Sequence, residues 1–163
     1  MLSPKPAKES YAQMAEIVHP GDTNPLGTIF GGRVVSLMDT AGAIAAMRHC
    51  RRPVVTASID RVDFISPIRT GYIVSLVAAV NYTARTSLEV GVRVESEDPQ
   101  TGERRHTASA YLTFVALDDL GHPTEVPQVL PESEDEKLRY EAGKRRREQR
   151  LRQRAEDGKP APR

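Results

Sequence analysis

Cysteine is almost absent from this chain of 163 residues, because Cys50 is the only one. A single cysteine excludes a disulfide within the chain and a metal site built from several cysteines. Long apolar runs are absent too, since no stretch approaches the roughly 20 residues that a helix needs to cross a bilayer. The first ten residues lack the apolar core of a secretory signal. We therefore expect a cytoplasmic protein without a membrane-spanning segment.

The chain also lacks an excess of charge of one sign. It has 23 Lys and Arg against 22 Asp and Glu, a formal net charge of +1 at pH 7. The chain as a whole then has no electrostatic preference for nucleic acid or for a membrane surface. The charges are unevenly placed, however. Residues 1–131 hold 12 basic and 14 acidic residues, whereas residues 132–163 hold 11 and 8.

Several common catalytic signatures are missing. No Gly-x-Ser-x-Gly motif occurs, so hydrolysis by a Ser-His-Asp triad is unsupported. The Gly31-Gly32 pair does not belong to a Walker loop, because Arg33 and Val34 stand where Lys and Ser or Thr are needed. The four histidines show neither metal-ligand nor triad spacing. We therefore expect no metal site.

The hydrophobic periodicity predicts an α+β domain. Residues 11–18 can form a first strand, and residues 31–49 a helix that is apolar nearly all round. From Pro53 onward apolar residues alternate, which predicts four strands. They span residues 54–64, 72–83, 88–96 and 104–117. Such a helix needs a sheet curled around it, and its exposed edge suggests a second copy, so we infer a homodimer.

Composition divides the chain into a domain and its extensions. We expect a flexible N-terminus over residues 1–10, one domain over 11–131, a charged helix over 132–157 and a disordered tail over 158–163. Acids crowd the start of the charged helix and bases its end, which suits the helix dipole, while Gly143 weakens its middle. A solvated helix face explains this segment better than nucleic-acid binding, because no aromatic residues interleave with the bases for stacking.

Asp39 is a carboxylate inside the apolar helix. Its helical neighbours are Val35, Ser36, Gly42 and Ala43. A face of such small side chains lets a thin ligand or another backbone approach closely. Because a buried carboxylate usually has a partner or a chemical role, Asp39 is a candidate catalytic residue. The alternative is a local bond to Ser36 that leaves the helix merely irregular.

Three further segments could assist this carboxylate. The amides of Gly31 and Gly32, at the positive end of the helix, suit a developing oxyanion, although a tight turn also uses such glycines. Asn24 could polarise a carbonyl or orient a water, or it could only shape its loop as an Asx-turn. The hairpin at residues 85–87 could hold phosphate through a cation, two hydroxyls and free amides. An exposed hairpin tip is the alternative.

Three stretches resemble the hotdog-fold acyl-CoA thioesterases: "HPGDTNPLGTIFGGRVVSLMDTAGAIAAMRHC", "VDFISPIRTG" and "ARTSLEVGVRVESEDPQTGERR". The most similar group is the cytosolic long-chain (brain-type) acyl-CoA hydrolases with their single-hotdog bacterial relatives. The resemblance covers residues 11–130, and the charged segment after it resembles the extension of the brain-type enzymes. The compound motif Asn-x-x-Gly-x-x-x-Gly-Gly-x₆-Asp is much more specific than any of its parts.

The resemblance implies a hotdog fold, in which an antiparallel sheet wraps around a long central helix. Dimers of this family share a continuous sheet, and a trimer of dimers, a homohexamer, is the usual assembly. The active site is then expected at the dimer interface, where Asn24 of one subunit faces Asp39 of the other. Because this chain holds both residues in one hotdog, two equivalent sites per dimer are expected.

The resemblance also implies a reaction, the hydrolysis of fatty acyl-CoA to free fatty acid and CoA without a cofactor. Asp39 is the general base or the nucleophile that forms an anhydride, and the sequence leaves this choice open. Asn24 would position the water or the thioester carbonyl, while the N–H of Gly32, and less surely of Gly31, would stabilise the oxyanion. Further substrate-binding candidates are Thr56 and Ser58 on the site wall, and Arg85, Thr86 and Ser87 near the CoA phosphates.

Two other functions fit the same fold. A hotdog hydratase or dehydratase normally works with a catalytic histidine, and none lies at the helix motif. A non-catalytic acyl-CoA-binding or regulatory module would not need Asn24 and Asp39 intact. We therefore favour the thioesterase over both.

Overall fold

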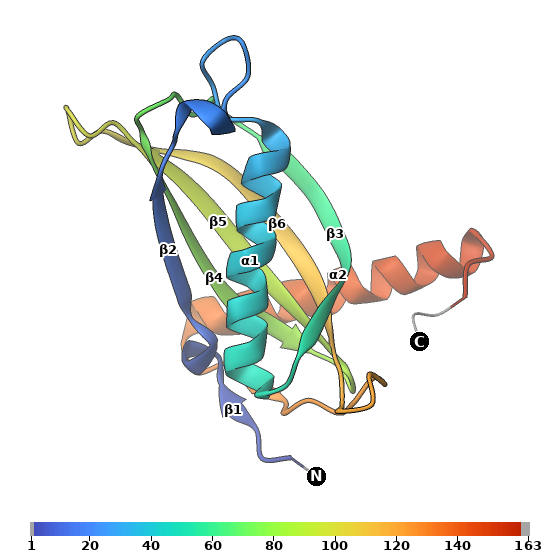
Figure 1. Cartoon of the computed structure of the whole chain (residues 1–163). Helices are drawn as coiled ribbons and strands as arrows, with labels where there is room; N and C mark the ends of the chain where they lie inside the picture. Colours follow the sequence, from blue (N-terminus) through green and yellow to red (C-terminus); the bar gives the residue numbers. More distant parts are fainter. Residues whose placement is uncertain (1, 161–163) are drawn as a thin grey trace.

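The computed structural model describes residues 2–160 and has one long helix inside a curled antiparallel sheet (Figure 1). The helices are the central α1 (Gly31–Cys50) and the C-terminal α2 (Glu134–Glu156). The main sheet contains β2 (Ala12–Ile17), β3 (Val54–Phe64), β4 (Ile73–Thr83), β5 (Ser87–Glu97) and β6 (Arg104–Ala116). The predicted α+β hotdog fold is confirmed, and each main element lies within two residues of its predicted bounds.

The strands are ordered β2-β4-β5-β6-β3, and every neighbouring pair is antiparallel. β5 therefore lies at the centre, and β3 is a free edge of the sheet. On β5, Leu88, Val90, Val92 and Val94 are buried against α1. Their strict alternation made this strand the clearest one in the sequence.

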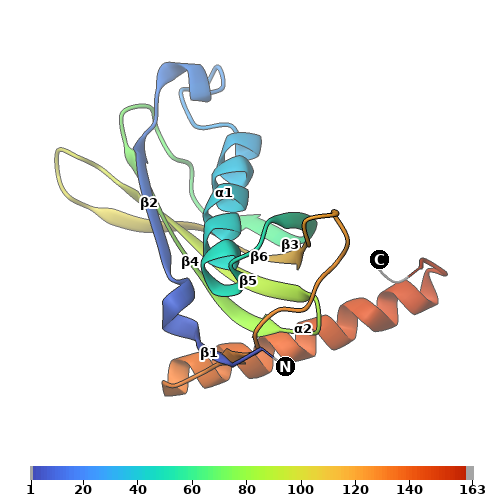
Figure 2. The same cartoon turned by 60° about the horizontal axis from the view of Figure 1, so that its bottom comes forward.

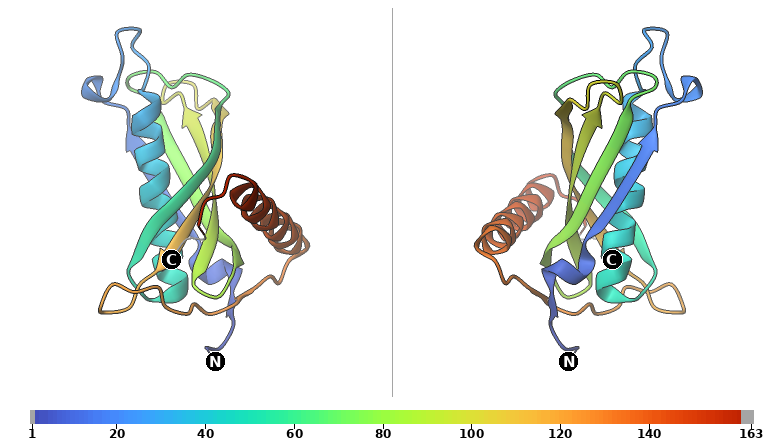
Figure 3. Two further views of the ribbon diagram at one scale, coloured as in Figure 1. Left: turned by 90° about the vertical axis from the view of Figure 1, so that its right-hand side faces the viewer. Right: turned by 90° about the vertical axis from the view of Figure 1, so that its left-hand side faces the viewer.

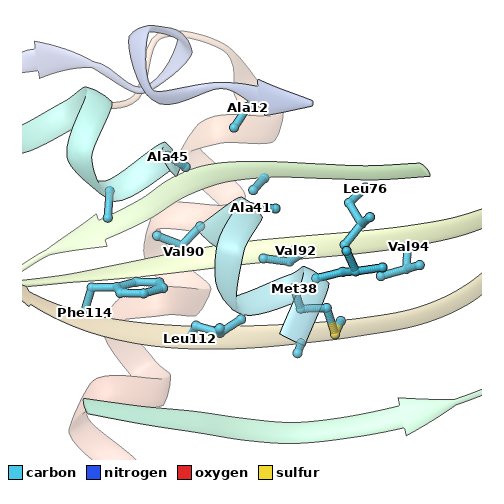
Figure 4. Packing of buried hydrophobic residues seen from close by; sticks show 14 of the residues in the cluster. Ala12, Met38, Ala41, Ala45, Leu76, Val90, Val92, Val94, Leu112 and Phe114 are labelled. Carbon is cyan, nitrogen blue, oxygen red and sulfur yellow. The ribbon is translucent and has the colours of Figure 1, made fainter. Parts of the chain in front are cut away.

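α1 packs on the inner face of the sheet through small side chains, among them Ala41 and Ala45, which are fully buried. Figure 4 shows α1 among larger side chains of β4, β5 and β6: Leu76, Val90, Val92, Val94, Leu112 and Phe114. The approach is closest at Gly42, where an added Cβ would lie 2.9 Å from Cε2 of Phe114. The glycine thus allows the helix to enter the curve of the sheet.

One side of α1 is not covered by the sheet of the same chain, although a helix that is apolar nearly all round is expected to be buried. Gly32, Ser36, Thr40 and Met47 are exposed, and Asp39 between them is half-buried. Apart from Met47, the residues of this side are small or polar, so most of it can stay open to solvent.

The N-terminal segment forms regular structure where we expected a loose chain. β1 (Lys5–Pro6) pairs in parallel with β7 (Val129–Leu130), and η1 (Ala7–Ser10) is a turn of 3-10 helix. Ser10 is buried, and its hydroxyl accepts a hydrogen bond from the Val80 amide at 2.8 Å. These contacts fix the segment to the end of β4. Of the tail predicted over residues 158–163, residues 161–163 lie outside the described residues.

α2 lies on the outer face of the sheet, opposite α1, as the two views of Figure 3 and the rotated view of Figure 2 show. Its predicted charge order is confirmed, with Ser133 as N-cap and acidic residues in the first turn. It does not present only a solvated face, however. Arg146 and Arg150 pair with Glu89 of β5, whose side chain is 1% exposed. Charged groups thus fasten the helix to the centre of the sheet.

Candidate active site

Asp39 and Thr56 form the centre of the site. Asp39 lies two turns into α1, and Thr56 lies on the facing edge strand β3. The Thr56 hydroxyl donates a hydrogen bond to the Asp39 carboxylate, with Oγ1 and Oδ1 2.6 Å apart. The local bond to Ser36 that the sequence allowed is not found among residues 2–160, where the Ser36 carbonyl accepts from Thr40 at 3.0 Å. Asp39 is therefore held from another element, as a functional carboxylate would be.

The structure separates Thr56 from Ser58, although residues two apart on a regular strand share a face. Thr56 pairs with Phe114 and Ser58 with Thr113, so the register shifts between them. This β-bulge turns Thr56 toward α1 and Ser58 toward the outer face under α2, where it lines a cavity with Arg150. The prediction that Ser58 shares the site wall with Thr56 is therefore wrong within one chain, because Ser58 lies on the other face of the sheet from Asp39.

Asn24 lies in the loop before α1, which projects beyond the end of the sheet (Figure 1). Its Oδ1 accepts from the Leu26 amide at 2.9 Å, and its Nδ2 donates to Thr28 Oγ1 at 2.9 Å. This is the Asx-turn that the sequence offered as the alternative. Within residues 2–160 no hydrogen bond joins Asn24 to Asp39 of the same chain. The loop tip is fully open, since Leu26 is 86% exposed.

Gly31 and Gly32 begin α1, and their amides point out of its first turn. The N-cap residue Phe30 makes no side-chain cap, and its carbonyl bonds the amides of Arg33 and Val34. The amides of Gly31 and Gly32 have no hydrogen-bond acceptor in the part of the chain that the structure describes. An added Cβ would meet nothing within 4 Å at Gly32 but would lie 3.3 Å from Cζ of Phe64 at Gly31, so a substrate oxygen has the more open approach at Gly32.

The third predicted segment, Arg85-Thr86-Ser87, lies at the other end of the sheet. It joins β4 to β5 beside the C-terminal end of α1, far along the helix from its glycine start (Figure 1). The Arg85 and Thr86 carbonyls accept from the amides of Val126 and Ala116, both at 3.0 Å. The segment is therefore a braced hairpin, and one chain does not bring it to Asn24.

Exposed apolar side chains lie on α1 and along β3, the two elements that carry the Asp39–Thr56 pair. We call this surface the β3–α1 face; its exposed apolar members are Met47, Ile59, Phe64 and Ile65, 38–63% exposed. β3 also leaves one edge of its 11 residues unpaired. A long, apolar free edge is a template for pairing with another strand. The site thus lies on a surface suited to cover by a second chain.

Other chemistries find little support in this geometry. Within residues 2–160 no group of three His, Cys, Asp or Glu side chains is placed to hold a metal ion. No helix of the described chain is long and apolar enough to span a membrane. The reactive groups of the candidate site are the Asp39 carboxylate, the Thr56 hydroxyl and, two turns away at the start of α1, the free amides of Gly31 and Gly32. Such a set can position water and stabilise an oxyanion.

Sequence reasoning missed the arginines of α2 that face the sheet. Arg146 lies over the Tyr111 ring, 3.5 Å from its centroid, and Arg150 joins Asp60 of β3 to Glu89. The available signal was Glu89 at a strand position where alternation places a half-buried side chain. Such a carboxylate needs a cation, and α2 supplies it.

Comparison with known proteins identifies the family. A model of the thioesterase superfamily matches residues 26–103. The uncharacterized acyl-CoA thioester hydrolase YkhA of Bacillus subtilis (strain 168) is 47% identical over 129 residues, covering 79% of this chain and 75% of the relative. The cytosolic acyl coenzyme A thioester hydrolase of Rattus norvegicus is 39% identical over 151 residues, covering 90% of this chain. This chain spans 39% of that rat protein.

Solved structures agree in fold over nearly the whole chain. A hexameric acyl-CoA thioesterase in its apo form has a TM-score of 0.90 at 45% identity, covering 94% of this chain and 99% of that chain. The acyl-CoA hydrolase of Staphylococcus aureus, solved with butyryl coenzyme A, coenzyme A and coenzyme A disulfide, has a TM-score of 0.87 at 43% identity, covering 94% of each chain. Other forms of it carry an Asp-to-Ala, an Asn-to-Ala or a Thr-to-Ala substitution. The chain belongs to the acyl-CoA thioester hydrolases of the thioesterase superfamily.

Proposed function

We propose that this chain hydrolyses fatty acyl-CoA to free fatty acid and CoA, with Asp39 as general base or as nucleophile. The observation that carries this proposal is the Asp39 carboxylate, held at 2.6 Å by Thr56 on an open apolar face. One carboxylate oxygen is engaged by Thr56, and the other stays available to water or to the thioester carbon. A thioester has a good thiolate leaving group, so one positioned carboxylate with oxyanion donors suffices.

The amides of Gly31 and Gly32 are the proposed oxyanion donors, since they are exposed and lack acceptors in the described chain. They belong to a helix start, where the dipole favours negative charge. Arg85, Thr86 and Ser87 stay candidates for the CoA phosphates. We propose no cofactor and no metal, because thioester hydrolysis by these groups balances with water alone.

A second subunit completes the proposed site. The loop that carries Asn24 projects beyond the end of the sheet (Figure 1), while the β3–α1 face has exposed apolar side chains. Two chains paired through β3 would run antiparallel and bring the Asn24 loop of each toward the helix of the other. The amide Nδ2 has a second N–H beyond its bond to Thr28, which could donate to the thioester carbonyl or to water.

The relatives also support a proposed larger assembly and cellular role. The solved apo-hexameric thioesterase supports a trimer of dimers for this chain. The cytosolic naming of the mammalian relative supports a cytoplasmic role in fatty acid metabolism. Asp, Asn and Thr are also the residue types replaced in the Staphylococcus aureus variants, which supports the choice of Asp39, Asn24 and Thr56.

Mixing two inactive variants tests the site and its sharing between subunits. Asn24→Ala and Asp39→Ala chains are each expected to lose turnover at least about 100-fold. After joint unfolding and refolding, random pairing gives about half mixed dimers with one complete site each, and about a quarter of wild-type activity returns. Thiol release from acyl-CoAs of increasing length is the readout. Burial raises the pKa of the Cys50 thiol. Cys50 therefore reacts only slowly with the thiol reagent that detects released CoA.

The outcomes separate the alternatives. Recovery of activity on mixing supports the shared site. Two inactive variants that never complement would place Asn24 and Asp39 in the same site of one chain. A wild-type protein that binds acyl-CoA without releasing thiol would instead be a binding module.

A further inference from the structure

A small cavity of about 70 Å³ lies between the second half of α2 and the outer face of the sheet. Three arginines of α2 line it, Arg147, Arg150 and Arg154, which are spaced so that they share one face of the helix. The strands contribute the carboxylate of Glu89 and four residues with hydroxyls, namely Ser58 of β3, Tyr82 of β4, Ser87 of β5 and Thr113 of β6. The cavity is on the opposite face of the sheet from Asp39, and of the residues proposed for the CoA phosphates it includes Ser87.

The arginines around this cavity outnumber the acids. Arg146 and Arg150 are matched by Glu89 and Asp60, in ion pairs of 2.5–3.0 Å. Arg147 and Arg154 are half-buried, yet neither has a carboxylate within 4.0 Å in the part of the chain that the structure describes. Two positive charges are therefore left without a counter-charge. Partly buried guanidinium groups without a partner favour an anion beside them.

The hydroxyls show the same lack of a partner. Thr113 Oγ1 is shielded from solvent and has no hydrogen-bond partner among the described residues. Ser58 is its neighbour across the β3–β6 ladder. A buried polar atom of this kind costs free energy unless an unseen group satisfies it. Thr113, which carries this buried hydroxyl, lines the same cavity as the two unpaired arginines.

We propose that this cavity binds one phosphate group, held by Arg147 and Arg154 and by the Thr113 hydroxyl. Guanidinium and hydroxyl groups are the donors that proteins use for phosphate oxygens. The volume exceeds the about 15 Å³ that a single water requires, and it is too small for a nucleoside. The phosphate is thus either free inorganic phosphate or the terminal phosphate of a larger ligand whose remaining part lies outside the cavity.

Titration with inorganic phosphate tests the site on the intact protein at constant ionic strength. The test protein is a double variant that combines Arg147→Gln and Arg154→Gln. The matched control is a double variant that combines Arg145→Gln and Arg152→Gln, at two exposed positions of the same helix. Both lose two charges, and both keep the Arg146 and Arg150 anchors of α2. Isothermal titration calorimetry is expected to show binding weakened at least about 10-fold in the test variant only. Thr113→Val, which keeps the side-chain shape, is expected to weaken binding as well.

Two substrates identify the source of the phosphate; this comparison alone relies on the proposed hydrolase activity. If CoA supplies the group through its 3′-phosphate, the test variant raises KM for acyl-CoA but not for acyl-3′-dephospho-CoA. If the ligand is free phosphate, KM is unchanged for both while the calorimetric difference persists. Equal phosphate binding by the test and control variants, or no binding by the wild-type protein, would overturn the proposal whether or not the enzyme turns over.

Discussion

Thr56 on β3 holds Asp39 on α1 through a hydrogen bond of 2.6 Å between Oγ1 and Oδ1. The bond crosses from the edge of the sheet to the uncovered side of the central helix, and neither partner comes from a flexible loop. β3 can present this hydroxyl because a bulge between Thr56 and Ser58 re-aims the strand. The hydrogen bond that holds the Asp39 carboxylate therefore depends on an irregularity in an edge strand.

Thr56→Val is expected to lower kcat by about 10- to 100-fold, because a hydrogen bond to a charged carboxylate is lost while the side-chain shape is kept. KM should change little, since Thr56 orients Asp39 rather than the acyl chain. Thr56→Ser, which restores the hydroxyl, is the control and should recover most of the turnover. Steady-state kinetics on one acyl-CoA measure both. A normal kcat in Thr56→Val would show that Asp39 needs no orienting bond.

Ile59→Lys is expected to break the dimer and to abolish activity together. Ile59 is 38% exposed on the β3–α1 face, and a lysine there would place a charge in the apolar contact between two β3 edges. Leu120→Lys, at an 81% exposed loop position, makes the same change away from this face and should leave assembly intact. Light scattering after size-exclusion chromatography reports the mass. Full activity in a monomeric Ile59→Lys protein would rule out a site that requires a second subunit.

The sequence predicted the sheet well because burial on one face imposes a period of two. Val90 and Val92 alternate with Glu89 and Gly91 without interruption, so the strand and its inner face could both be assigned. The same rule failed at Ser58. A bulge leaves no local signature in the residues of the strand, because it arises from pairing with β6.

For the C-terminal helix, the local features could be predicted from the sequence but the position on the sheet could not. Its existence, its capping residue Ser133 and its charge order follow from local propensity, and all were predictable. Its position was not, because a basic helix face is equally compatible with solvent. Only the three-dimensional structure shows that Glu89 is buried beneath Arg146 and Arg150. The same holds for Asn24, whose proposed catalytic role requires a second chain.

His49 is expected to make folding less favourable below about pH 6.5. Burial lowers its pKa, despite a contact of 3.0 Å between Nε2 and the Pro127 carbonyl, and its Nδ1 has no partner among residues 2–160. The unfolded chain then binds the proton at higher pH than the folded chain. The free energy of unfolding is therefore fully retained above about pH 6.5 and falls as the pH drops toward the lowered pKa.

Urea unfolding at pH 7.5 and pH 5.5 measures this effect. His49→Gln, which can still donate to Pro127, should lose much of the difference between the two pH values. His122→Gln, at an exposed loop position, should keep it. A pH dependence unchanged in His49→Gln would assign the loss to other groups.

Gly143→Ala is expected to destabilise the protein, although alanine is the better helix former. In an exposed helix the change would stabilise by about 1 kcal/mol. Here an added Cβ would lie 2.9 Å from Cβ of Tyr82 and 2.9 Å from Oε1 of Glu89. Neither atom can move cheaply, since one is joined directly to the β4 backbone and the other is held by Arg146. Overpacking of this kind costs about 1–3 kcal/mol, which exceeds the gain in propensity.

The net loss of about 1 kcal/mol corresponds to a Tm lower by about 2–4 °C for a chain of this size. Because the clash lifts α2 from the sheet, limited proteolysis should cut α2 faster in Gly143→Ala than in the wild-type protein. Gly21→Ala, where an added Cβ meets nothing within 4 Å, is the matched control and should change neither measurement. A higher Tm in Gly143→Ala would mean that α2 is not seated on Glu89 and Tyr82, and that its arginines face solvent.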